Sequence, residues 1–261
     1  MQTDELMSQR QPLTDIAIES LDNVLASIES RLGLALTSVC IGFFLFISSS
    51  LYAPPEFSLE GYYAYHAIDP LRPGSLENVD QRRVYRILSP LLANSLGFVG
   101  KRYVYLEKSL IILFISLVYL FYRKRDHSIA LSFSMCLILS FSLLVVHPNV
   151  WPGYVDVAGF VLLFLIFISI AQEQIITPWV LFFIALLNHE IVVFQLPFFI
   201  AFQYYTVWYQ GDQNKPVYMM IVPPLLSISL YGLYLTLFTL FIFSANPLFI
   251  YTPISEQTIR N

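Results

Sequence analysis

The feature that most constrains this chain is a series of long apolar segments. The first runs from Leu32 to Leu51 without a single Asp, Glu, Lys or Arg. An α-helix rises 1.5 Å per residue, so about 20 mostly apolar residues cross the roughly 30 Å hydrocarbon core of a bilayer. Further apolar segments cover residues 104–122, 128–146, 155–171, 177–209 and 217–243. This series predicts an all-α, polytopic transmembrane bundle of six to seven hydrophobic elements.

Composition supports a membrane protein and excludes one class of partner. Hydrophobic residues make up 57% of the chain and charged residues only 12%, whereas about a quarter of the residues of a soluble domain are charged. We therefore expect membrane lipids as partners. With a net charge of -4 and no basic run longer than residues 123–125, the chain lacks the electrostatic footprint of a nucleic-acid-binding protein. No sequence pattern predicts a metal site or a cofactor.

Two of the apolar segments contain signals that interrupt a helix. Residues 177–209 would form one helix of about 50 Å, too long for the hydrocarbon core, so we expect a break near residues 188–190 or near Pro197. In residues 217–243, Pro223 and Pro224 remove backbone donors and predict either a kink or the helix start.

The chain divides into an acidic N-terminal segment, residues 1–30, and a single transmembrane domain, residues 31–261. Apolar residues at helical spacing predict an amphipathic helix in the first. Because membrane-surface helices are usually rich in Lys and Arg, this acidic helix is expected to dock on the protein's own cytoplasmic face or on a protein partner.

The distribution of basic residues predicts the orientation. The short loop at residues 123–125 carries three positive charges, which places it in the cytoplasm by the positive-inside rule. Counting back through the span that precedes this loop, we expect the polar loop of about residues 52–103 to lie outside and the N-terminus to lie in the cytoplasm. The outer loop is also expected to contain short helices.

The external loop carries the first candidate site. Glu60 and Asp69 lie in its first half, and Arg82, Arg83 and Arg86 in its second. Arg82 and Arg86 at i and i+4 share one face of a helix, and guanidinium groups suit a phosphate. Ser89, Pro90 and Gly97 predict the N-cap, first residue and end of a short helix. Alternatively, the arginines anchor the loop at the lipid headgroups.

Two further candidates lie in a turn between apolar segments and in the middle of an apolar segment. His147 and Asp156 flank a turn between two spans, where an acidic residue also suits the positive end of a helix dipole. Asn188, His189 and Glu190 interrupt an apolar stretch, and ionisable residues at membrane depth usually face the bundle interior. Arg86 is the expected partner of Glu190, with His189 as the local alternative. If residues 188–190 form a cytosolic turn instead, they are ordinary loop groups.

Four short motifs, which follow one another along the chain, resemble those of a known group of membrane proteins. They are Tyr62-Tyr63, the segment from Val84 to Ala93, Gly153-Tyr154-Val155-Asp156, and Leu187-Asn188-His189-Glu190. The set resembles bacterial polytopic proteins similar to the GT-C type membrane glycosyltransferases. The adjacent acid pair common in that fold is absent, and the chain is short for the class.

This resemblance implies a location in the inner membrane of a bacterium, an activity and the residues that carry it. It implies glycosyl transfer from a polyprenyl-phosphate-linked sugar, with Glu60 or Asp69 as the catalytic carboxylate. Arg82, Arg83 and Arg86, with His147, Asp156 and Asn188 to Glu190, are then the substrate-binding candidates. The alternative is a non-catalytic membrane protein, either a small transporter or a subunit of a larger assembly.

Overall fold

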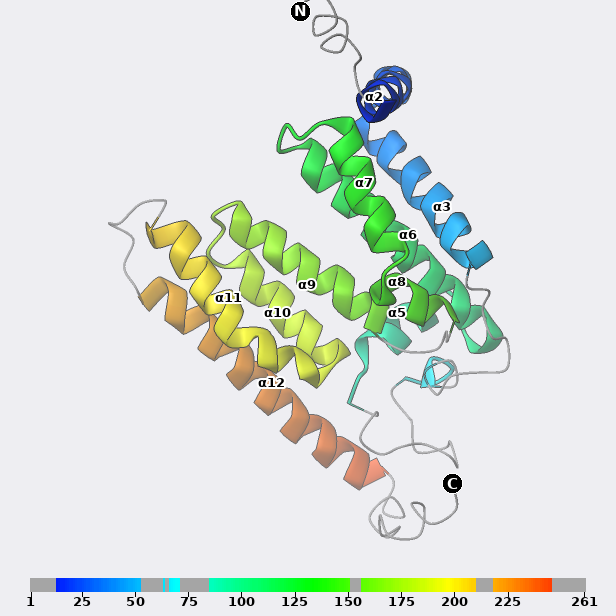
Figure 1. The fold of residues 1–261 in the computed structure, drawn as a ribbon. Coiled ribbons are helices and arrows are strands. Elements are labelled where there is room, and N and C mark those ends of the chain that lie inside the picture. Colours follow the sequence, from blue (N-terminus) through cyan, green and yellow to red (C-terminus); the bar gives the residue numbers. More distant parts are fainter. Residues whose placement is uncertain are drawn as a thin grey trace, which may run out of the picture. The chain divides into compact units, whose positions relative to one another are not determined.

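The chain folds into helices in two compact units. The computed structural model describes residues 13–52, 63, 66–70, 85–150, 156–209 and 218–245, and all regular structure among them is helical (Figure 1). The first unit comprises Met1–Pro55 and Ser109–Val150, and the second comprises Glu56–Lys108 and Trp151–Asn261. The all-α prediction is confirmed.

Three helical segments are long and apolar enough to cross a membrane. They are Leu34–Leu51, Gly100–Arg123 and Met220–Phe241. Shorter apolar helices cover Ile129–Ser140, Val157–Ala171 and Thr177–Asn188. The chain thus has the helices of a membrane protein, and the segments predicted at residues 32–51, 104–122 and 155–171 hold the helices Leu34–Tyr52, Tyr103–Arg123 and Asp156–Ala171.

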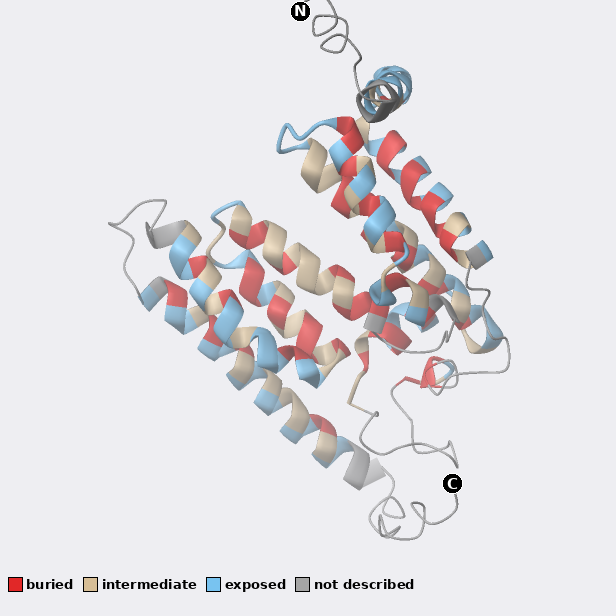
Figure 2. Cartoon of the chain, viewed as in Figure 1, coloured by how far each residue is buried: buried red, intermediate tan, exposed pale blue. Residues whose placement is uncertain are grey.

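The first unit packs around its span helix α3. It contains α2 (Leu13–Leu32), α3 (Leu34–Tyr52), the later part of α6 (Tyr103–Arg123), α7 (Ile129–Ser140) and α8 (Leu143–Val150). Buried residues recur on one face of α3, among them Ile41, Leu45 and Ser49, while Phe43, Phe44 and Ile47 are exposed. This division is visible along α3 (Figure 2). An exposed apolar face of this kind suits contact with lipid.

A glycine sets the distance between α3 and α6. A Cβ added at Gly42 would overlap the Ser116 hydroxyl and lie 2.7 Å from the Ile112 carbonyl oxygen. The Ser116 hydroxyl donates to that same carbonyl at 2.7 Å. Small residues at such a contact let two membrane helices approach closely.

The predicted single helix at residues 128–146 is wrong, because the structure has two. Helix α7 ends at Ser140, and α8 begins at Leu143. The Ser140 hydroxyl donates to the Cys136 and Leu137 carbonyls, and the Ser142 hydroxyl donates to the Leu139 carbonyl. Serine side chains that bond nearby carbonyls compete with the helical backbone, which accounts for a break without Gly or Pro.

The second unit contains the remaining helices. They are α5 (Leu88–Ser95), η3 (Gly100–Arg102), the first part of α6, α9 (Asp156–Ala171), α10 (Thr177–Asn188), η4 (Glu190–Gln195), α11 (Leu196–Gln203), η5 (Tyr204–Tyr209) and α12 (Tyr218–Ala245). Its core forms between α9, α10 and α11. Ile166, Trp179, Phe182 and Phe199 are among the residues buried there.

Residues 177–209 form a helical hairpin, not one span. Helix α10 ends at Asn188, and η4 then turns the chain into α11. Gln203, at the end of α11, accepts from Trp179 Nε1 at 2.8 Å and donates to the Gln174 and Ile175 carbonyls. The end of α11 therefore returns to the start of α10. The break predicted near residues 188–190 is confirmed.

Three sequence signals that predicted the ends of helices have different outcomes. Pro223 and Pro224 lie inside α12 and do not set its start, which is Tyr218. Ser89 is not the N-cap of α5: the helix begins at Leu88, its N-cap is Ile87, and no side chain caps it. Gly97 ends the helix as predicted, with a φ of 73° that glycine adopts readily.

Candidate functional site

Arg86 and Glu190 form the charged centre of the second unit. Arg86 immediately precedes Ile87 and α5, and Glu190 is the first residue of η4 after α10. The arginine Nε donates to Glu190 Oε2 at 2.9 Å, and Nη2 donates to Oε1 at 2.6 Å. The predicted partnership of these two residues is confirmed. Arg86 is not helical, so the expectation that Arg82 and Arg86 share a helix face fails at Arg86.

A tyrosine from the loop completes the contacts of the guanidinium. Arg86 Nη1 donates to the Tyr63 hydroxyl oxygen at 2.9 Å. A guanidinium group has five N–H donors, and these three bonds leave two, one on each terminal nitrogen. The Arg86 side chain is 17% exposed and the Glu190 side chain 49% exposed. Arg86 is thus held firmly, yet it retains donors for an anion.

A second polar contact joins α5 to the same turn. The Ser89 hydroxyl donates to Asn188 Oδ1, and both residues are buried. A Cβ at Gly159 of α9 would lie 3.5 Å from Asn188 Nδ2, so α9 runs close beside the amide. Asp156, the first residue of α9, precedes Gly159 by about one helical turn; its side chain lies outside the described part.

His189 shapes the turn between α10 and η4. Its Nδ1 accepts from the Ile191 backbone N–H at 3.2 Å and lies 3.6 Å from Glu190 Oε2. The side chain therefore caps η4, and a neutral imidazole is required for that bond. The three residues of the 188–190 motif take different roles: an amide bound to Ser89, a cap, and a carboxylate bound to Arg86.

Tyrosines of α12 place this centre beside the candidate membrane span of that helix. Tyr231 is close enough to interact electrostatically with both Glu190 and Arg86. The Tyr234 hydroxyl donates to the carbonyl of Tyr85, the residue before Arg86, at 3.1 Å. Tyr231 lies 11 residues after the start and 10 before the end of the span Met220–Phe241. The charged pair therefore lies level with the middle of this helix.

Asp69 lies beside a buried histidine. His66 is fully buried, and the Asn94 side chain of α5 donates to the Ala67 carbonyl at 2.9 Å, which ties this turn to α5. Burial lowers the pKa of the His66 imidazole from 6.5 to about 4, although the Pro70 carbonyl and the Asp69 carboxylate act in the opposite direction. The folded protein thus keeps His66 neutral at pH 7.

We expect acid to destabilise the protein through His66. Its pKa is depressed in the folded state, so between pH 6.5 and 4 the unfolded chain binds a proton that the folded chain does not. This loss amounts to about 2 kcal/mol by pH 5. The melting temperature of the detergent-solubilised protein should therefore fall more between pH 7.5 and 5 for the wild type than for His66→Gln. Equal falls in both proteins would contradict this assignment.

The structure describes no contact between Arg86 and the other predicted residues. Glu60, Arg82 and Arg83 lie outside the described residues. His147 is an exposed residue of α8 in the first unit. Among the described residues, no hydrogen bond links Asp69 to Arg86 or Glu190; its charge acts on His66.

One buried acidic residue in the candidate span Gly100–Arg123 was not singled out from the sequence. Glu107 is 3% exposed. It is the only acidic residue between Tyr103 and Arg123 and lies next to Lys108, and a carboxylate within an otherwise apolar segment was the available signal.

Comparisons with protein-family models, with curated proteins and with solved structures found no match.

Proposed function

We propose that this chain is a membrane-embedded enzyme that transfers a glycosyl group from a polyprenyl-phosphate-linked sugar. The observation that carries the proposal is the Arg86–Glu190 pair, level with the middle of the span in α12. A charged pair at such a depth is costly to build and is typically retained for function. The motif resemblance to GT-C enzymes supplies the substrate class.

In this proposal Arg86 binds the phosphate that leaves. Glu190 and Tyr63 occupy three of its donors and orient it, and the two remaining donors bind phosphate oxygens. Such a preorganised cation stabilises the negative charge that develops as the bond to the leaving group breaks. Glu190 is then a positioning residue, and Asn188 and His189 hold the turn from which it projects.

The proposed reaction exchanges one bond to the anomeric carbon for another. The oxygen of an acceptor hydroxyl attacks the anomeric carbon, the bond from that carbon to the phosphate oxygen breaks, and polyprenyl phosphate leaves with the bonding electrons. A carboxylate of the loop, Glu60 or Asp69, takes the hydroxyl proton as general base. Arg82 and Arg83 add positive charge for the phosphate.

We expect Arg86→Lys to lose nearly as much activity as Arg86→Ala. Lysine keeps the charge but cannot bond Glu190 through two parallel N–H groups and still offer two more to a phosphate. Loss of such a group costs about 100-fold in rate. The measurement is release of polyprenyl phosphate from a panel of polyprenyl-phosphate hexoses by the purified, reconstituted protein.

Arg102→Lys is the matched control. Arg102 is an exposed residue of η3 in the same unit, and this variant should keep wild-type activity. Full activity of Arg86→Lys would instead assign Arg86 to anchoring. Absence of transfer by the wild type with every donor would favour the non-catalytic alternative.

The proposed orientation places the N-terminus in the cytoplasm of a bacterium, in a multi-pass inner-membrane protein. Glu29, near the end of α2, contacts Arg123, at the end of α6. The start of α3 and the end of α6 therefore lie at the same end of the first unit. This agrees with an N-terminal helix and a basic loop on one side, which the positive-inside rule assigns to the cytoplasm.

Labelling of single cysteines tests this orientation. Cys40 and Cys136 are first removed, and a cysteine is placed at Lys124, which is exposed after α6, or at Ser75 in the predicted outer loop. In intact cells an impermeant thiol reagent should label the cysteine at position 75 and not the one at 124. Labelling at 124 alone would reverse the orientation.

A further inference from the structure

Helix α2 presents three different faces. Its buried face holds Leu25, which is 8% exposed, with the half-buried Asp22 and Glu29 beside it. A second face is apolar and exposed, with Val24 at 56%, Ile28 at 37% and Leu32 at 44%. Successive residues of a helix are about 100° apart, so Val24, Ile28 and Leu32 form one strip beside the buried face. On the far side lie the exposed polar residues Asn23, Ser27 and Ser30.

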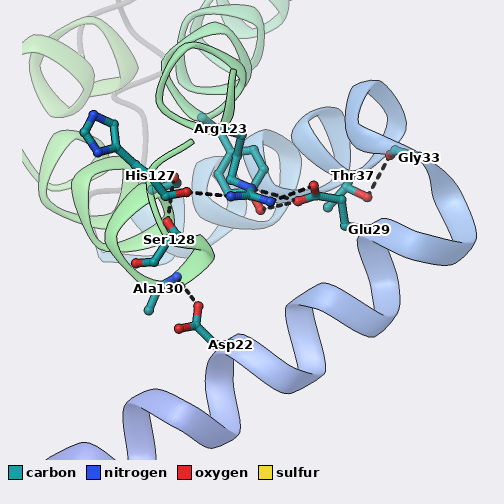
Figure 3. Close-up of polar contacts among 10 residues, drawn as sticks. Asp22, Glu29, Gly33, Thr37, Arg123, His127, Ser128 and Ala130 are labelled. Atoms are coloured by element: carbon teal, nitrogen blue, oxygen red, sulfur yellow. Dashed lines mark hydrogen bonds and ion pairs between the residues drawn. The ribbon is translucent and has the colours of Figure 1, made fainter. Parts of the chain in front are cut away.

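Acidic side chains attach α2 to its own unit. Glu29 accepts from Arg123 Nε at 3.1 Å and Nη2 at 3.0 Å, and Asp22 accepts from the Ala130 backbone N–H at 2.5 Å, near the N-terminus of α7 (Figure 3). Of the acidic side chains described on α2, only Glu19 remains exposed. Two of the three acidic side chains described on α2 thus face the protein, and docking of α2 on its own unit, one of the two expected arrangements, is confirmed.

The strip lies beside the start of a membrane span. Gly33, with a φ of 76°, turns the chain from α2 into α3, and the span begins at Leu34. In Figure 1, α2 is seen nearly end-on and α3 from its side, so the two axes are steeply inclined. If α3 crosses the membrane, α2 lies along its surface. The exposed strip continues through Leu32 to the exposed Leu36 and Val39 of α3.

We propose that the strip Val24, Ile28 and Leu32 lies in the headgroup and upper acyl region of the membrane that α3 spans, with anionic phospholipid as its partner. The apolar side chains leave water at this boundary, as in other interfacial helices. Exposed cations lie on the same unit: Arg31 on α2, and Lys124 and Arg125 directly after Arg123, which binds Glu29 of α2. Each basic residue near an anionic surface contributes about 1 kcal/mol of attraction.

Spin labels at single positions of the full-length protein test this proposal. In a Cys40→Ala, Cys136→Ala background, a nitroxide is attached at Val24→Cys, Ile28→Cys, Asn23→Cys or Ser27→Cys. Each protein is reconstituted into vesicles of phosphatidylcholine with phosphatidylglycerol. The spin relaxation of the nitroxide is measured with oxygen, which concentrates among acyl chains, and separately with a water-soluble nickel chelate. The two accessibilities are then compared.

We expect the oxygen-to-nickel accessibility ratio to be several-fold higher at Val24 and Ile28 than at Asn23 and Ser27. High nickel accessibility at all four positions would overturn the proposal, because the strip would face water. Low accessibility of Val24 and Ile28 to both reagents would also overturn it, because the strip would then be covered by a protein.

The lipid charge is tested by a second comparison. Vesicles of phosphatidylcholine alone should lower the ratio at Val24, and Lys124→Gln with Arg125→Gln should weaken that dependence on phosphatidylglycerol. If phosphatidylglycerol did not affect the oxygen-to-nickel ratio at Val24 in the protein that keeps Lys124 and Arg125, the assignment of anionic lipid would be overturned.

Discussion

Replacement of Glu190 by leucine is expected to abolish the proposed glycosyl transfer and to destabilise the second unit by about 2 kcal/mol. It leaves Arg86, whose side chain is 17% exposed, without its counter-charge. Breaking a fully buried ion pair costs about 3–5 kcal/mol, and the half-exposed position of Glu190 reduces that penalty. The measurements are the melting temperature in detergent and the transfer rate.

Glu190→Gln separates folding from function. Glutamine keeps an oxygen that accepts one hydrogen bond from Arg86 but loses the charge, so this variant should fold and insert into the membrane while transfer falls. The double variant Arg86→Leu, Glu190→Leu should recover part of the stability lost in Glu190→Leu, because neither charge remains unpaired. It should not recover transfer. If Glu190→Leu were more stable than wild type and fully active, Glu190 would be a loop or lipid-boundary residue.

Replacement of Gly42 by leucine is expected to destabilise the first unit by about 3 kcal/mol. The new Cβ would overlap the Ser116 hydroxyl and press on the Ile112 carbonyl oxygen, 2.7 Å away. Because a helix backbone cannot move aside as a flexible side chain can, the two helices must separate, and overpacking of this kind costs about 1–3 kcal/mol or more. The expected result is a large fall in the melting temperature in detergent.

Two further variants show whether this loss arises from the contact between α3 and α6. Gly232→Ala in α12 places a Cβ where no atom lies within 4 Å, and it should leave the melting temperature unchanged or raise it, since alanine favours helix by about 1 kcal/mol. In a Gly42→Ala protein, adding Ser116→Ala should restore only part of the stability lost at Gly42, because the Ile112 carbonyl oxygen remains close to the new Cβ. A wild-type melting temperature for Gly42→Leu would contradict the close approach.

The sequence alone predicted the helical fold and the main helices. A segment of about 20 apolar residues has one way to satisfy its backbone in lipid, which is a helix, so Leu34–Leu51 and α6 followed from composition and length. The break at residues 188–190 followed from the same arithmetic, since α10 and α11 together are too long for one span. A partner for Glu190 was also predictable, because an unpaired carboxylate within an apolar segment is too costly, and the structure selects Arg86 over the alternative His189 for the two short hydrogen bonds.

Only the tertiary structure decided the contacts that give these residues their roles. The Ser89 hydroxyl, predicted to cap its own helix, bonds Asn188, 99 residues away. Glu29 bonds Arg123 and thereby turns an acidic helix toward its own unit. Local spacing reports which residues share a helix face, and it does not report which other surface that face meets. That choice depends on packing between segments far apart in the chain, and the close contact at Gly42 is a product of the same packing.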